Sequence, residues 1–245
     1  MIRTQTHGEV HEIALARPEK RNALTPEMLR DLLAAVHAIR PLTKSVLLSG
    51  DGAGFCAGFD LSLCKDSPDG SVMRSLLTNL HECVAALRSL EVPVVIAAHG
   101  AAIAGGCAIL GGGDVILTNT DAKLGYPVAR LGVSPAVSAT FLQNLTGDGV
   151  TRARQLENGL IDGRAALACG LAHECLDTAE AVRPRALEAA AALASKPPHA
   201  VAATKRWLAE VAPVRLGDAG LRASLGLVGS EEEKRLLPIA WSAAR

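Results

Sequence analysis

The sequence predicts an α/β protein, and three observations support this prediction. Short apolar runs such as SVLLSG, PVVIAA and DVILTN have the length and the aliphatic content of buried strands. Segments whose apolar residues recur at helical spacing separate these runs along the chain. The resulting alternation of strand, helix and strand is typical of parallel β units joined by crossover helices. From about residue 135 the pattern becomes mostly helical, so we expect a helical region at the C-terminal end.

The first half of the chain supplies most of the predicted strands. Residues 9–17 (EVHEIALAR) alternate polar and apolar side chains, as in a half-buried strand, and the polar turn RPEKRNALT follows. Residues 25–40 predict a helix, because Thr25 is a typical N-cap and Pro26 suits the first helical position. Buried strands are predicted at residues 45–50, 93–98 and 114–119, and an amphipathic helix is predicted at residues 71–90.

The second half predicts a series of helices and one strand. The strand is LAHECL at residues 171–176, and the clearest hinge is the Lys-Pro-Pro segment at residues 196–198. We therefore divide the chain into a core of residues 1–195 and a C-terminal helical region of residues 196–245. Helices are predicted at residues 134–145, 150–159, 163–170, 179–195 and 199–211, with further helices beyond them.

The composition argues against several classes of protein. Lys and Arg total 25 and Asp and Glu total 25, so neither a strongly basic nucleic-acid surface nor a polybasic membrane anchor is expected. No stretch reaches the roughly 18 apolar residues that a membrane span needs. The six cysteines form no dense framework, which favours reduced thiols and a cytoplasmic location.

Two glycine-rich loops follow predicted strands. The first is GDGAGFCAGFDLS at residues 50–62, and the second is AGGCAIL at residues 104–110. Both place backbone amides near strand ends, and two amides that converge on one oxygen form an oxyanion hole. Removal of one such donor typically costs about 2.7–4 kcal/mol of transition-state stabilisation. The composition alone leaves an alternative open, in which the glycines only permit tight turns and close packing.

Four motifs carry a resemblance to a known family. RPEKRNAL, GDGAGFCAGFDL, PVVIAAHGAAIAGGCAI with GGGD, and AKLGYPVARLG resemble the enoyl-CoA hydratase/isomerase, or crotonase, family in their order and spacing. The segment ENGLIDGRAALACGLAHEC looks like the family's helical segment before its last strand, so the resemblance covers residues 9–177. It implies a crotonase-like spiral of ββα units with an acyl-CoA site in residues 1–195. It also implies that the C-terminal helices pack between subunits of a homotrimer or a dimer of trimers.

The resemblance further implies which residues form the site. By position, Ala57 and Gly105 supply the two N–H groups that bind the thioester carbonyl oxygen. No cofactor is expected besides the coenzyme A that forms part of the substrate, and no metal is expected. Asp60 is also expected to hold the shape of its loop. The residues expected along the CoA groove are Arg21, Asn22, Ala23, Phe59, Asp60 and Leu61.

This sequence departs from the family where the usual acids stand. Ala108 and Val128 occupy the positions of the two hydratase glutamates, and Ala136 stands where some isomerases place an aspartate. A methyl or isopropyl group cannot transfer a proton or polarise water. We therefore do not expect hydration, whereas isomerase or decarboxylase chemistry through a thioester enolate stays open. The alternative is an acyl-CoA-binding pseudoenzyme, or an assembly partner, without turnover.

Other side chains are candidates for the missing acid or base. Tyr126 lies two positions before the lost second acid, and Arg74 and His81 lie on the helix that follows the first glycine loop. Each of the three is a candidate acid, base or orienting group. The alternative for each is a structural role, which is the more frequent role of a single residue of these types. Weaker candidate donors are Ser134, Ser138 and Thr140, and structural roles are expected for His99 and Asp114.

A zinc site and a nucleotide site are both weakly supported. Cys169, His173 and Cys175 would need a fourth ligand, and alternation along a strand would separate their side chains. The glycines of the first loop do not match GxGxxG, and neither GxSxG nor GK[ST] follows a strand.

Overall fold

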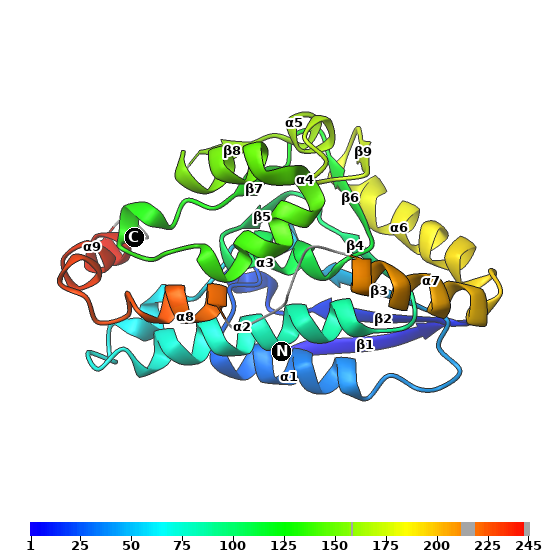
Figure 1. The fold of residues 1–245 in the computed structure, drawn as a ribbon, viewed down its shortest axis with the longest axis horizontal. Helices are drawn as coiled ribbons and strands as arrows, with labels where there is room; N and C mark the ends of the chain where they lie inside the picture. The colour runs from blue at the N-terminus through cyan, green and yellow to red at the C-terminus, as the bar shows by residue number, and fades with distance from the viewer. Residues whose placement is uncertain (158, 212–218, 243–245) are drawn as a thin grey trace.

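A six-stranded sheet, in the order β1-β2-β3-β4-β6-β9, runs through the centre of the fold (Figure 1). The structure is a computed structural model that describes residues 1–157, 159–211 and 219–242. The hairpin strands β1 and β2 are antiparallel, and every other neighbouring pair in this sheet is parallel. The strands are β1 (Ile2–His7), β2 (Val10–Leu15), β3 (Ser45–Gly50), β4 (Val94–Ala97), β6 (Val115–Asn119) and β9 (Glu174–Leu176).

A smaller second sheet, β5-β7-β8, lies beyond the ends of these strands. After β4 the chain forms β5 (Ala101–Ile103) and then a helix, and after β6 it forms β7 (Lys123–Gly125) and then a helix. The loop after β3 joins the same layer, because Cys56 forms an isolated bridge with Ala102. Strand β8 (Leu160–Ile161) completes the second sheet. The predicted spiral of ββα units is confirmed by this repeated order.

The helices of the described residues lie on both faces of the large sheet and away from it. They are α1 (Pro26–His37), α2 (Ser71–Ser89), α3 (Gly105–Ile109), α4 (Ala136–Leu156), α5 (Gly163–Ala168), α6 (Ala179–Ala194), α7 (Pro198–Val211), α8 (Ala219–Leu225) and α9 (Glu231–Ser242). As the sequence predicts, α1 begins after Thr25, whose hydroxyl accepts the N–H of Met28 at 3.0 Å. Among the described residues, no helix is both long enough and apolar enough to cross a membrane.

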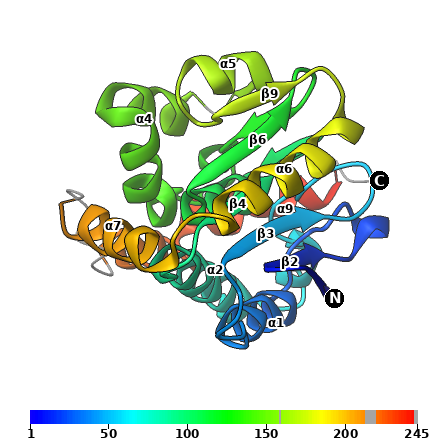
Figure 2. The ribbon, with the colours of Figure 1, turned by 90° about the vertical axis from the view of Figure 1, so that its right-hand side faces the viewer.

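Side chains of β3 divide the core into two layers. Leu47 faces α6 and packs with Val182 and Ala186, whereas Val46 and Leu48 face the cluster that includes α1 and α2. Figure 2 shows α6 crossing one face of the parallel strands and α1 and α2 on the other side. Aromatic residues make up only 2% of the chain, so aliphatic side chains fill most of both layers.

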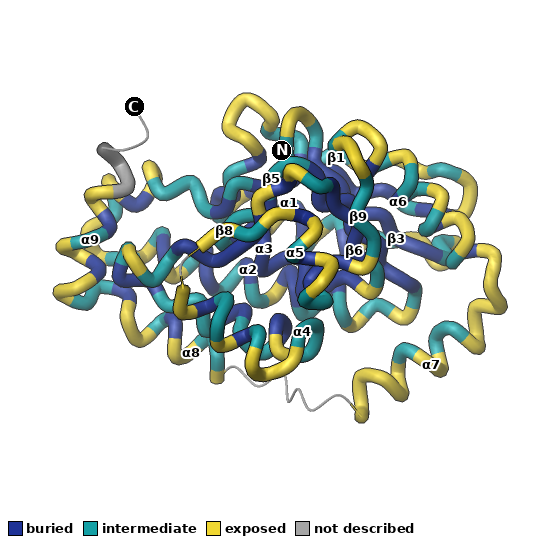
Figure 3. The backbone as a smooth tube through the Cα atoms, turned by 90° about the horizontal axis from the view of Figure 1, so that it is seen from above, coloured by how far each residue is buried: buried dark blue, intermediate teal, exposed yellow. Residues whose placement is uncertain are grey.

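The C-terminal region divides into two differently packed parts. Helix α7 has no buried residue, and Trp207 and Leu208 expose 63% and 57% of their surface (Figure 3). By contrast, α8 and α9 return to the core, where Val228 and Leu237 are buried. The part of the predicted region 196–245 that comprises residues 212–218 and 243–245 lies outside the described residues.

Several short elements were not predicted from the sequence. The four additional strands are β1, β5, β7 and β8: β1 is polar and partly exposed, and the other three have only two or three residues. The predicted helices at 134–145 and 150–159 meet in α4, where Gly147 alone has a non-helical backbone (φ 78°). Residue 158 of the second prediction lies outside the described part of the chain.

Candidate active site

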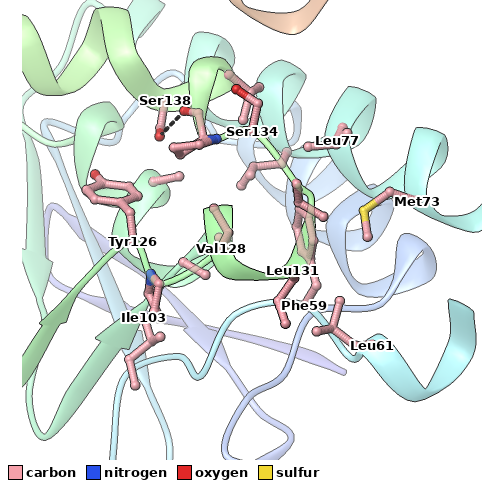
Figure 4. A pocket seen from close by; sticks show the side chains of 18 of the residues that line it. Phe59, Leu61, Met73, Leu77, Ile103, Tyr126, Val128, Leu131, Ser134 and Ser138 are labelled. Carbon is pink, nitrogen blue, oxygen red and sulfur yellow. Dashed lines mark hydrogen bonds between the residues drawn. The ribbon is translucent and has the colours of Figure 1, made fainter. Parts of the chain in front are cut away.

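A cavity of about 480 Å³ lies where the carboxyl ends of β3 and β4 meet α2 and the segment that leads into α4 (Figure 4). Most of its wall comes from the first glycine loop, the β5–α3 turn with α3, residues 126–138 and one face of α2, and Arg21 and Ile239 complete it. The lining residues are Arg21, Ala57, Phe59, Leu61, Met73, Leu77, Leu80, Ile103, Ala104, Gly105, Ala108, Tyr126, Pro127, Val128, Arg130, Leu131, Val133, Ser134, Pro135, Val137, Ser138 and Ile239.

Asn22 fixes the first glycine loop from beneath. Its side chain is fully buried, and its Nδ2 donates to the carbonyl oxygens of Asp51 at 2.8 Å and Gly54 at 3.0 Å. Its Oδ1 accepts the N–H of Arg17 at 2.9 Å. Asn22 therefore does not line the cavity: its amide holds the loop, and any contact with CoA would come from its backbone.

Asp60 and Arg17 close the other end of this loop. Arg17 Nη1 donates to Asp60 Oδ2 at 2.8 Å and to the carbonyl of Ala23 at 2.9 Å. Burial alone would raise the pKa of Asp60, but hydrogen bonds from Ser62 and Arg17 outweigh burial and lower it. Asp60 is thus a carboxylate in an ion pair outside the cavity lining, as expected for a residue that holds the shape of the loop.

The structure contradicts the prediction that Ala57 donates to the substrate. The Ala57 N–H already donates to the carbonyl of Arg21 at 3.0 Å, so it is not available to a ligand.

The N–H of Phe59, two residues further along the loop, faces the other way. Leu24 N–H donates to Gly58 O at 2.7 Å and Asp60 N–H donates to Leu24 O at 2.9 Å, which places Phe59 in a parallel bridge with Leu24. Successive amides of an extended segment point to opposite sides. The Phe59 N–H therefore points away from Leu24, toward the side of β5 and α3.

Phe59 N–H and Gly105 N–H both lack a hydrogen-bond acceptor among the described residues. Gly105 is the first residue of α3, so no residue four positions earlier accepts its N–H within the helix. The two segments are in close contact, because a Cβ on Gly58 would stand 3.6 Å from Gly105 N. Phe59 N–H and Gly105 N–H are thus two free amides on adjoining segments of the cavity wall, and the donor role of Gly105 stays a prediction.

No carboxylate replaces the missing acids. Ala108, which is 4% exposed, and Val128 both lie in the lining, and both are apolar. Ala136 stands at the start of α4 and is not part of the lining. No Asp, Glu or His side chain is among the described residues of the cavity wall.

Of the three candidate acids or bases, only Tyr126 lines the cavity. The Tyr126 side chain is buried, and its hydroxyl donates to the carbonyl of Cys107 at 3.3 Å. Burial raises the pKa of Tyr126 well above its usual value. The phenol therefore stays protonated at neutral pH.

The structure contradicts the expectation that Arg74 or His81 reaches the acyl group. The Arg74 guanidinium donates to the carbonyls of Leu225 and Val228, at 3.4 and 3.1 Å, and so holds the end of α8. The His81 ring lies against Phe141 of α4, with ring centroids 6.2 Å apart. Neither side chain lines the cavity, in contrast to Leu77 of the same helix.

Some of the other predicted site residues line the cavity and others do not. Arg21, Phe59 and Leu61 line the cavity, whereas Asn22, Ala23 and Asp60 do not. Ser134 and Ser138 line it and Thr140 does not. The apolar wall of α2 was not predicted, although the helical spacing of Met73, Leu77 and Leu80 indicates one face of that helix. Arg130 lines the cavity within the motif AKLGYPVARLG but was not named as a site residue, and Gln155, which contacts Ser138 from outside the lining, was not predicted either.

Residues expected to be structural have structural partners. His99 is buried and its Nε2 lies 3.0 Å from Gly52 O, and Asp114 Oδ2 accepts the Val94 N–H at 2.7 Å. His173 Nδ1 accepts the N–H of Ile116 at 2.9 Å, so this nitrogen is engaged in a structural hydrogen bond. Within the described ranges, no three His, Cys, Asp or Glu side chains gather into a metal site.

The fold and the cavity define an α/β protein of the ββα-spiral class with a ligand pocket at strand ends. The family profile described as enoyl-CoA hydratase/isomerase matches residues 5–230. EchA14 of Mycobacterium tuberculosis, named a probable enoyl-CoA hydratase, is 33% identical over 196 residues, which cover 79% of this chain and 75% of that protein. EchA19 of the same organism, named an enoyl-CoA hydratase, is 31% identical over 227 residues, which cover 84% and 79%.

Solved structures agree with these sequence matches. An enoyl-CoA hydratase/isomerase from Xanthobacter autotrophicus Py2 superposes with a TM-score of 0.89 at 25% identity, covering 98% of this chain and 93% of that one. The chain belongs to the enoyl-CoA hydratase/isomerase family. The predicted crotonase-like fold is thereby confirmed.

Proposed function

We propose that this protein acts on an acyl-CoA thioester and stabilises its enolate between the N–H groups of Phe59 and Gly105. The observation that carries the proposal is the presence of these two amides, both without an acceptor, on the wall of one cavity. A family whose members act on acyl-CoA supplies the substrate class. Two fixed donors would hold the carbonyl oxygen while negative charge develops on it, and each would contribute about 2.7–4 kcal/mol to the transition state.

Among reactions through an enolate, decarboxylation of a β-carboxyacyl thioester fits the cavity better than hydration. Addition of water needs one group that removes a proton from water and one that protonates carbon, and the described lining holds no Asp, Glu or His. In decarboxylation the bond to the carboxylate breaks, its electron pair forms the enolate, and CO₂ leaves. One proton must then reach the α-carbon. Double-bond migration needs a group that both takes and returns a proton, so it makes a greater demand on the same lining.

The apolar wall favours the loss of a carboxylate. Most of the lining is apolar, and Ala108, Val128 and Val137 cannot form a hydrogen bond to an anion. A carboxylate placed against these three side chains would lose hydration on that side, which raises the free energy of the bound substrate. Loss of CO₂ transfers the negative charge to the thioester oxygen, where the two amides receive it.

A panel of three thioesters tests this proposal. Purified protein is incubated with crotonyl-CoA, a 3-enoyl-CoA and methylmalonyl-CoA, and hydration, double-bond migration and CO₂ release are followed separately. We expect CO₂ release from methylmalonyl-CoA and no hydration of crotonyl-CoA. Hydration at a rate typical of an enzyme would contradict the proposal, because it would require a base that the lining does not contain.

A second candidate is an acyl-CoA-binding protein without turnover, and the same apolar pair, Ala108 and Val128, favours it. Calorimetric titration with the three thioesters, run beside the turnover assays, separates the two candidates. Binding in the micromolar range with no turnover of any of them would favour this second function.

The predicted homotrimer or dimer of trimers is retained as part of the proposal. Trp207, Leu208 and Val211 expose 63%, 57% and 52% of their surface on α7, and such side chains are typical of a surface that another subunit covers. Light scattering on the purified protein measures the mass directly. The cytoplasmic location and the lack of any cofactor besides coenzyme A stay predictions.

A further inference from the structure

One buried polar cluster borders the otherwise apolar cavity. It consists of Tyr126, Ser138 and Gln155, whose exposed fractions are 3%, 2% and 9%. Tyr126 and Ser138 line the cavity on the same side of it (Figure 4). Apart from Arg21 and Arg130, Tyr126 is the one titratable side chain of ordinary acid–base use in the described lining.

We propose that Tyr126 delivers the proton to the α-carbon of the enolate, and that Ser138 and Gln155 position its phenol. This inference rests on the proposed function, because it needs an enolate between Phe59 N–H and Gly105 N–H. It adds the identity of the proton donor, which the loss of both usual acids leaves unassigned.

Tyr126 is fixed relative to the free amide of Gly105. Strands β5 and β7 pair Ile103 with Gly125, the residues that precede the two segments, and Ala104 N–H donates to Gly125 O at 2.8 Å. At the other end of the side chain, the phenol donates to Cys107 O at 3.3 Å, within α3. The Gly105 amide and the Tyr126 phenol are therefore held in a fixed relation by β5, β7 and α3, and both lie on the wall of the cavity that would receive the thioester.

Ser138 is held by a network of its own. Its hydroxyl donates to Pro135 O at 2.8 Å, and Gln155 Nε2 donates to Ser138 Oγ at 3.2 Å and to Pro135 O at 3.4 Å. The first of these bonds is drawn in Figure 4. Tyr126 and Ser138 line the same side of the cavity (Figure 4), and burial raises the pKa of Tyr126 while a side-chain hydrogen bond with Ser138 opposes that shift. Ser138 and Gln155 are assigned as positioning residues, since the proton itself comes from Tyr126.

The proton transfer balances with groups already present. Loss of CO₂ leaves the electron pair of the broken bond on the enolate, and the α-carbon takes the phenolic proton as the carbonyl reforms. A thioester enolate carbon is a stronger base than a phenolate, so the transfer is downhill. Tyr126 is left as a phenolate, and water that enters the cavity after product release returns its proton.

The same groups predict how the rate depends on pH. Because burial raises its pKa well above the usual value, Tyr126 stays a phenol through neutral and mildly alkaline solution. The titratable group that faces it is the Cys107 thiol, whose own pKa burial raises to about 12. We therefore expect a turnover number that is flat between about pH 6 and pH 9, without the acidic limb that a glutamate would give.

Decarboxylation of methylmalonyl-CoA in D₂O tests the proton donor. Wild-type protein should place one deuterium on the α-carbon of propionyl-CoA in a single configuration. Tyr126→Phe should release CO₂ at least about 10²-fold more slowly and yield a mixture of configurations, because solvent would then protonate the enolate. The Kd for propionyl-CoA should change less than twofold. An unchanged rate and a single configuration in Tyr126→Phe would overturn this inference alone, whereas no CO₂ release from the wild type would overturn the proposed function and this inference with it.

The positioning residues have a separate test. Ser138→Ala and Gln155→Met should lower the turnover number several-fold with little change in KM, and Ser138→Thr, which restores a hydroxyl, should recover most of it. Thr140→Ala, on the same helix but outside the lining, is the matched control and should leave the rate unchanged. Equal losses in Ser138→Ala and Ser138→Thr would show that the serine serves only packing and would overturn its positioning role.

Discussion

A Cβ on Gly105 would stand 2.9 Å from Cε1 of Phe59, which is closer than real side chains approach. The two residues that carry the free amides of the cavity wall are therefore packed against each other. Glycine is required at 105 because the ring of Phe59 occupies the space that a side chain would need. The position of one amide thus depends on the side chain of the residue that supplies the other.

Gly105→Ala is expected to impair function more than stability. The added methyl group pushes against the Phe59 ring, which displaces the two amides relative to each other, and a misplacement of about 1 Å can cost about 10²-fold in rate. Since the ring can move, we expect a stability loss of only about 1–3 kcal/mol. Turnover of methylmalonyl-CoA and denaturant unfolding measure the two effects.

Two other glycines serve as controls for this substitution. A Cβ on Gly106 would stand 2.5 Å from Cys56 O, a backbone atom that cannot turn away, so Gly106→Ala should destabilise the fold itself. Gly149 in α4 has no atom within 4 Å of an added Cβ, so Gly149→Ala should preserve both stability and rate. Normal turnover in Gly105→Ala would contradict the role assigned to this amide.

Tyr126 is the only tyrosine of the chain, so its ionisation can be followed without interference. Burial raises its pKa well above the usual value of 10, because the phenolate would lose its hydration. In the folded protein, phenolate absorbance should therefore stay absent when the pH passes 10, whereas in denaturant it should appear with a midpoint near 10. A folded-state midpoint at or below 10 would contradict the buried environment on which the proton-donor inference depends.

Much of the fold could be predicted from the sequence, because its long elements have strong periodic patterns. Helices α1 and α2 and strands β3, β4 and β6 lie within a few residues of the predicted ranges. The strands of the second sheet have only two or three residues, and so short a segment carries no period. Their existence depends on pairing between distant segments, such as Cys56 with Ala102.

The site was predicted less completely, for a different reason. The motifs locate the glycine loops, but the choice between Ala57 and Phe59 depends on which side of an extended segment each N–H faces. That direction is set by hydrogen bonds to Arg21 and Leu24, which come from another turn of the chain. Likewise, nothing in the helical pattern of α2 separates Leu77, which faces the cavity, from Arg74, which binds the end of α8.

Restoring both acids should create the activity that their loss excludes. In Ala108→Glu/Val128→Glu, two carboxyl groups would enter the cavity, one available as an acid and the other as a base. Each acid–base group contributes typically about 10²–10⁴-fold, so the double variant should hydrate crotonyl-CoA at least about 10²-fold faster than the wild type. The isosteric Ala108→Gln/Val128→Gln is the control, since amides do not transfer protons, and it should stay inactive.

We predict that the Asn22 side chain stabilises the first glycine loop and does not bind the ligand. Asn22→Ala removes three hydrogen bonds of a fully buried side chain and leaves two carbonyls and one N–H without their partner. We expect a loss of about 2–4 kcal/mol in the free energy of unfolding. Calorimetry without ligand would detect this loss of stability. A variant with unchanged stability but weaker acyl-CoA binding would contradict this prediction and would show that the Asn22 side chain binds CoA.

Acid sensitivity should arise at Glu12, far from the cavity. Its carboxylate is 1% exposed and is bound by Arg183 Nε at 2.7 Å, Ser49 Oγ at 2.7 Å and His7 Nε2 at 2.8 Å. Burial raises the pKa of Glu12, but these hydrogen bonds outweigh burial and lower the pKa from 4.5 to about 2. A lowered pKa means that the folded state favours the carboxylate. The stabilisation is therefore complete above pH 4.5 and is lost as the pH falls toward 2.

Glu12→Gln should accordingly lose about 2–3 kcal/mol of stability at pH 7, a figure reduced because Arg183 is partly exposed. Its stability should then fall less steeply than that of the wild type between pH 4.5 and pH 2, because the variant has no proton to bind at this position. Glu9→Gln is the matched control, since Glu9 is 51% exposed and pairs only with Lys44, and its stability should change by less than about 0.5 kcal/mol. Parallel acid unfolding curves for Glu12→Gln and the wild type would contradict this assignment, because another carboxylate would then have to account for the acid-sensitive stability.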